Sequence, residues 1–128
     1  MIRDRALKVV LVLPGLFFCA GIYPIADALW HPDVAEAYGD YMMLSLYVTL
    51  GVFLLIAARH PSSHRSLIAF TAWSSFAHAL VMGTMGFQFA SQRVGFLWGS
   101  VVLVVIGVVL IVLAPAKASA AFASASAD

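Results

Sequence analysis

The chain has 128 residues, of which 63% are hydrophobic and 10% are charged. Soluble globular domains are roughly 45–50% apolar and about 25% charged, so the composition excludes an ordinary soluble domain. The net charge of +1 gives no reason to expect nucleic acid as a partner. Cys19 is the single cysteine, which excludes an intrachain disulfide.

Four apolar stretches, each about one bilayer thick, occupy most of the chain. At a rise of about 1.5 Å per residue, a helix of about 20 residues spans a hydrocarbon layer of roughly 30 Å. We therefore predict an all-α, four-helix transmembrane bundle over residues 1–115. The Ala- and Ser-rich tail, residues 116–128, has little to bury and is expected to be disordered. The predicted spans are residues 7–26, 41–58, 67–87 and 94–114.

Basic residues are distributed unevenly between the two faces of this bundle. With four spans, the N-terminus, the link between spans two and three, and the tail lie on one face, and the opposite face carries only Arg93 and an acidic loop. Cytoplasmic segments are enriched in Lys and Arg, so both termini and the tail are expected in the cytoplasm. The basic residues of that face are Arg3, Arg5, Lys8, Arg59, Arg65 and Lys117.

A short basic turn joins the second and third spans. Pro61 ends the second helix, and so short a link predicts that the two spans are antiparallel neighbours. Arg59, His64 and Arg65 are expected to face lipid head groups on the cytoplasmic side. His60 and His64 are four residues apart, but the proline between them spoils a one-face geometry and no Cys or carboxylate is near. We therefore expect no metal site.

The third span carries a polar face. Thr71, Ser75 and His78 follow an i, i+4, i+7 spacing, and Ser74 flanks them. His78 is the only readily ionisable side chain deep in a span, apart from the thiol of Cys19. Ionisable residues near the bilayer midplane are costly and count as functional candidates, although a neutral imidazole avoids most of the cost.

Three roles for His78 are open from the sequence. The favoured role is a hydrogen bond in the bundle interior, to Ser74 or Ser75 of its own span or to a residue of the second span, namely Ser45, Tyr47 or Thr49. The second is contact with a ligand, haem or pigment; haem is not favoured because no other span supplies a second axial histidine. The third is proton transfer, for which no chain of acids and bases continues across the membrane.

The fourth span carries a stripe of small residues. Gly95, Gly99 and Gly107 recur at helical spacing, and glycines in this pattern let helix backbones approach closely. We predict a helix-packing face here, which meets either another span of this chain or a second subunit.

The segment A-A-R-H-P-S-S-H-R-S-L-I (residues 57–68), followed by W-S-S at 73–75 and by His78, resembles an uncharacterised family of small bacterial four-helix membrane proteins, known only as a domain of unknown function. The resemblance covers roughly residues 40–87. It implies this fold and a bacterial inner-membrane location, and it implies no reaction. A helix climbs about 21 Å from residue 64 to residue 78, so the turn and the mid-membrane face cannot form one small site. The positions that match the family's motifs are Arg59, His64, Arg65, Trp73, Ser74, Ser75 and His78.

No Ser/His/Asp set, pair of catalytic acids or phosphate-binding loop occurs in the sequence, so enzymatic activity is not expected. The leading hypothesis is a non-enzymatic interaction or accessory subunit, surrounded by membrane lipid and associated with other membrane subunits or a second copy of itself. One alternative is a small-molecule binder or transporter whose midplane pocket is lined by His78, Ser75, Ser74, Thr71 and Thr49. The other is an accessory subunit of a respiratory or photosynthetic complex, with His78 contacting a haem or pigment.

Overall fold

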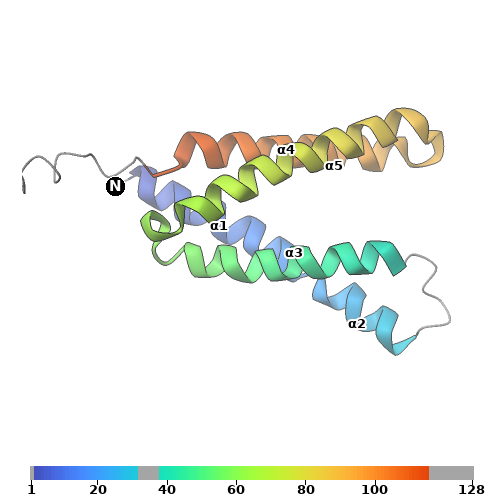
Figure 1. Ribbon diagram of the computed structural model, residues 1–128, viewed down its shortest axis with the longest axis horizontal. Coiled ribbons are helices and arrows are strands. Elements are labelled where there is room, and N and C mark those ends of the chain that lie inside the picture. Colours follow the sequence, from blue (N-terminus) through green and yellow to red (C-terminus); the bar gives the residue numbers. More distant parts are fainter. Residues whose placement is uncertain (1, 32–37, 116–128) are drawn as a thin grey trace, which may run out of the picture.

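The computed structural model describes residues 2–31 and 38–115. Within these ranges the chain forms helices and turns without a strand, and four helical segments are long and apolar enough to cross a membrane (Figure 1). This confirms the predicted all-α bundle of four membrane-spanning helices. The predicted disordered tail, residues 116–128, lies outside the described residues.

The first membrane segment is divided into two helices, α1 (Ile2–Cys19) and α2 (Ile22–Trp30). The break follows from Pro24, which has no N–H to donate to the carbonyl of Ala20. That carbonyl instead accepts a hydrogen bond from the N–H of Tyr23, at 3.2 Å. Pro24 therefore lies in the first turn of the new helix, where its missing N–H costs little.

The remaining helices begin and end within three residues of the predicted spans. Hydropathy marks only the part of each helix inside the hydrocarbon layer, whereas the hydrogen-bonded helix continues a little further into the interface. Two short 3₁₀ turns, η2 and η3, connect them. The bounds are α3 Tyr38–Ala57, η2 Pro61–His64, α4 Arg65–Gln88, η3 Ala90–Gln92 and α5 Arg93–Leu113.

The four long helices form two closely packed pairs. α1 packs against α3, α4 packs against α5, and α1 also contacts α5. α3 and α4 make few contacts with each other, although η2 joins them directly, and they spread apart from that turn (Figure 1). The short link makes α3 and α4 antiparallel, as predicted. The prediction that they are also packing neighbours is wrong, because α3 packs against α1 and α4 packs against α5.

Glycines permit the close approach within each pair. A Cβ atom added to Gly51 of α3 would lie 2.7 Å from the backbone oxygen of Gly15 in α1. A Cβ atom added to Gly107 of α5 would lie 3.0 Å from the backbone oxygen of Ala72 in α4. Both pairs therefore bring backbone against backbone, which is the usual role of small residues between membrane helices.

The buried core lies toward the end of the bundle that contains η2. We call this end the closed half, and the opposite end, toward η3 and the start of α3, the open half. The core unites residues along α1 and in the first two turns of α4 with residues at the C-terminal ends of α3 and α5. Its members are Leu7, Leu11, Phe18, Leu54, Ala58, Ile68, Ala72 and Leu110.

Arginines bond to the C-terminal carbonyls of α5 and α4. The guanidinium of Arg3 donates hydrogen bonds to the backbone oxygens of Val112 and Ala114, at 3.3 and 2.9 Å. The guanidinium of Arg93 donates to the backbone oxygen of Gly86, at 3.1 Å. These carbonyls have no partner within their helices, so cationic side chains stabilise the helix ends. The contact from Arg3 also joins the start of α1 to the end of α5 on one side of the bundle.

Candidate functional site

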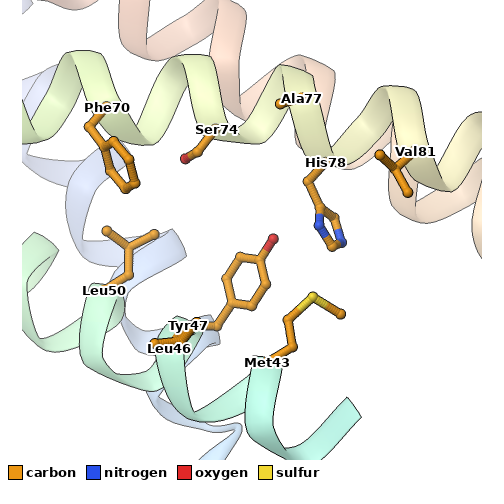
Figure 2. Close-up of a pocket in the computed structure, with 9 residues that line it drawn as sticks. All are labelled: Met43, Leu46, Tyr47, Leu50, Phe70, Ser74, Ala77, His78 and Val81. Carbon is orange, nitrogen blue, oxygen red and sulfur yellow. The ribbon is translucent and has the colours of Figure 1, made fainter. Parts of the chain in front are cut away.

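Tyr47 and His78 face each other where α3 and α4 diverge. Tyr47 lies in the middle of α3, and His78 lies past the middle of α4. Their ring centroids are 5.4 Å apart and the rings meet edge to face, with an interplanar angle of 78°. Figure 2 shows the phenol oxygen of Tyr47 directed toward α4 and the imidazole of His78 directed toward α3. The two helices therefore bring two polar rings together inside the apolar segment of the bundle.

A groove of about 410 Å³ runs between α3 and α4 on one side of this ring pair. Most of its wall is aliphatic, and no charged side chain lines it (Figure 2). Its polar groups are the phenol, the imidazole and one serine hydroxyl. The lining residues are Met43, Leu46, Tyr47, Leu50, Phe70, Ser74, Ala77, His78 and Val81.

A second cavity of about 500 Å³, which we call the inner chamber, also has Tyr47 and His78 in its wall. The other lining residues come from the first membrane segment, from α3, from α4 and from α5, so the chamber lies among all four spans. None of them is charged. They are Phe17, Phe18, Ala20, Gly21, Pro24, Leu44, Met82, Gly99, Val102, Leu103 and Ile106.

Of the five residues predicted to line a midplane pocket, His78 and Ser74 line the groove. Thr71 and Ser75 are 0% and 5% exposed and line neither cavity, and Thr49 is exposed away from both. All four hydroxyl groups donate to a backbone carbonyl of their own helix, at 2.7–3.2 Å. Such internal bonds satisfy a hydroxyl without any partner from another helix.

The imidazole of His78 has no hydrogen-bond partner among the described residues. The serines beside it on α4 donate to backbone carbonyls, and Tyr47 meets it ring to ring. The interior hydrogen bond favoured from the sequence is therefore not formed. The reason is local: a helix offers each hydroxyl a carbonyl one turn earlier, which is always within reach. His78 instead presents its ring nitrogens toward the cavities.

Tyr47 is the principal site residue that sequence reasoning did not select. The sequence indicated it only as one possible partner of His78. A usable signal was present, because Tyr47 is the only tyrosine in the middle of a predicted span, whereas Tyr23, Tyr38 and Tyr41 lie near a membrane boundary. The other groove residues of α3 are ordinary apolar positions, which carry no sequence signal.

The predicted glycine face of the fourth span is largely directed at α4 of the same chain. Cβ atoms added to Gly99 and Gly107 would meet Met82 and Phe76, whereas Gly95 has no neighbouring atom within 4 Å. The hydroxyl of Ser100 also lies 3.0 Å from the backbone oxygen of Ala79 in α4. Two of the three glycines thus contribute to packing inside the chain.

The predicted basic residues at the second turn lie in the closed half, away from the groove. Arg59 is exposed beside η2, and His64 and Arg65 are partly buried at the junction of η2 and α4. Within residues 2–31 and 38–115, no group of three His, Cys, Asp or Glu residues has the geometry to hold a metal ion. The turn and the groove are separate features, as the helical distance of about 21 Å requires.

A family model matches residues 3–126 of the chain. The chain belongs to a family of unknown function, DUF6632. The match covers all four membrane segments and is wider than residues 40–87, on which the sequence-based resemblance rests. No protein with curated annotation and no solved structure matches the chain significantly.

The chemistry available at the site is hydrogen bonding and contact with aromatic surfaces. The lining of the two cavities contains one imidazole, one phenol and one serine hydroxyl, and it contains no carboxylate. For a haem, His78 is the single nitrogen ligand in the groove wall, where the thioether of Met43 is another donor.

Proposed function

We propose that this protein is a non-enzymatic protein of the bacterial inner membrane that binds a lipophilic small molecule in the groove between α3 and α4. The observation that carries the proposal is His78, which lies at membrane depth beside an uncharged groove and has no hydrogen-bond partner among the described residues. A polar group left unpaired in an apolar medium costs roughly 2–7 kcal/mol. An occupant with a hydrogen-bonding group removes that cost.

The accessory-subunit hypothesis is the second candidate, and its arguments are weaker. It relied on the glycine face of the fourth span, on the unbroken apolar surface around that face, and on a chain with little room for an internal cavity. Gly99 and Gly107 are directed at α4 of the same chain, and spaces of about 410 and 500 Å³, both open at the surface, lie between the helices. Gly95, which is open, and the exposed apolar surface of α5, which includes Val101, Val105 and Val112, still support a second copy or another membrane subunit. A haem or pigment at His78 stays a prediction and is not favoured.

The proposal is tested by identifying the lipophilic compounds that copurify with the protein. We expect mass spectrometry of an organic extract to find a compound enriched with the wild-type protein and strongly depleted with His78→Leu. Thr84→Val is the matched control, because Thr84 is exposed on the same helix, lines neither cavity and bonds to its own helix. Identical extracts from the wild type and His78→Leu would contradict ligand binding at this site.

We further propose that both termini and η2 lie on the cytoplasmic side, in agreement with the excess of basic residues there. Single cysteines introduced into a Cys19→Ala background report the orientation. Ser63→Cys in η2 should be protected from a membrane-impermeant maleimide in intact cells, and Ser91→Cys in η3 should be labelled. The reverse pattern, or labelling of both positions, would refute this orientation.

A further inference from the structure

Tyr47 and His78 are shared by the walls of two apolar spaces. Both residues line the groove between α3 and α4, and both line the inner chamber among the four spans. The phenol and the imidazole thus lie together in a wall that both apolar spaces share. This arrangement suits a molecule with one compact polar part and a hydrocarbon tail, rather than a molecule that is polar along its length.

The polar part of such a ligand is uncharged. Neither cavity is lined by Asp, Glu, Lys or Arg, so a carboxylate, phosphate or ammonium group would lack a fixed counter-charge at membrane depth. The phenol and the imidazole each supply a hydrogen-bond donor, whereas the hydroxyl of Ser74 already donates to the backbone of its own helix. Two donors, one from each helix, favour a group that accepts hydrogen bonds, such as a carbonyl.

The wall around these donors fits a flat ring. The rings of Tyr47 and Phe70 and the thioether of Met43 line the groove (Figure 2). Aromatic faces and methionine sulfur pack well against planar π systems. The inner chamber, lined by Phe17, Leu44 and other apolar side chains, has room for a hydrocarbon tail.

We propose that the site binds a lipophilic quinone, with its ring carbonyls at Tyr47 and His78 and its tail in the inner chamber. This inference rests on the proposed function, because it names the class of molecule that occupies the same site. It requires no chemical change in the quinone. Binding alone satisfies both donors and fills both spaces.

The experiment titrates a decyl-substituted benzoquinone into the full-length protein in lipid nanodiscs. Wild-type protein should bind it saturably, and the infrared carbonyl band of the bound quinone should shift to lower frequency because the carbonyls accept hydrogen bonds. Tyr47→Phe keeps the ring and removes one donor, so it should weaken binding about 3- to 10-fold and reduce the shift. His78→Leu should do the same, and His78→Gln, which restores an N–H donor, should recover part of the binding. Circular dichroism and gel filtration verify that each variant is folded.

Ala20→Leu tests where the tail lies. Ala20 is exposed to the inner chamber and is not part of the core, so the substitution narrows the chamber without removing a buried contact. It should weaken binding of the decyl compound about 10-fold and leave binding of a benzoquinone that lacks the tail nearly unchanged. An equal effect on both compounds would overturn the placement of the tail.

The outcomes separate the two proposals. Binding of a long-chain fatty acid or a long-chain alcohol that depends on His78, without binding of the quinone, would overturn the quinone assignment and leave the proposed function standing. Absence of any His78-dependent binding among these three probes, with no depleted compound in the extracts, would overturn both proposals.

Discussion

The closed and open halves of the bundle differ in how closely their helices pack. Thr71, Ser75 and His78 lie on one face of α4, yet Thr71 and Ser75 are buried in the closed half and His78 faces the cavities. In the closed half, small residues such as Ala58 and Ala72 bring the helices together. Where the bundle opens, aromatic rings stand between the helices. The cavity therefore arises because the two helix pairs diverge. The polar face of α4 continues through both halves and does not by itself mark where the cavity lies.

The close contact of α1 and α3 gives the largest expected effect. A Cβ atom on Gly51 would lie 2.7 Å from the backbone oxygen of Gly15 and 2.9 Å from the backbone nitrogen of Cys19. Gly51→Val therefore forces two backbones apart, and we expect a loss of about 3 kcal/mol or more in the free energy of unfolding. Unfolding in mixed micelles by a denaturing detergent measures this loss.

Gly95→Val is the matched control for Gly51→Val, because no atom lies within 4 Å of a Cβ added there. Its stability should stay within about 0.5 kcal/mol of the wild type. A large loss for Gly95→Val that depends on protein concentration would instead indicate an interface between subunits at this glycine, and equal losses for both variants would contradict the packing described for α1 and α3.

Alanine substitutions at two leucines of α3, one in each half, compare how much side-chain packing contributes to stability in the two halves. Leu54 is 0% exposed in the closed half, and Leu46 is 71% exposed beside the groove. Leu54→Ala should lower the free energy of unfolding by about 2 kcal/mol, at the low end of core truncations, because surrounding lipid is as apolar as leucine and only packing is lost. Leu46→Ala should change stability little. Similar losses would show that the two halves are equally well packed.

The contact of Arg3 with the end of α5 gives the smallest expected effect. Arg3→Gln removes the charged donor to the backbone oxygens of Val112 and Ala114, which are exposed to solvent. We expect a loss of about 0.5–1 kcal/mol. Hydrogen exchange should show faster fraying in the last turn of α5. Arg5→Gln is the control, since Arg5 has no hydrogen-bond partner among the described residues, and equal fraying in both variants would contradict the role of Arg3.

Most of the fold follows from the sequence, and much less of the site does. The length of the apolar stretches predicts the membrane helices. Every backbone N–H and C=O must be hydrogen-bonded within the bilayer, and a helix forms these bonds within a single segment. The prolines of the first segment predict a kink, and the structure divides this segment at Gly21, just before Pro24, whereas Pro14 lies inside the undivided α1. The i, i+4, i+7 pattern places His78 on the same face of α4 as Thr71, and it could not distinguish the buried Thr71 from His78, which lines the groove.

The sequence by itself determined that this chain is a four-helix membrane protein with its cations gathered at one end and one imidazole deep among apolar residues. Hydropathy, helix length and spacing are local properties, and they suffice for those conclusions. Only the tertiary structure decided that α3 pairs with α1 rather than with α4, and that Tyr47 therefore faces His78 across a groove. The angle between two helices depends on side chains from the other helices packed against them, and these contacts join residues that are far apart in the sequence.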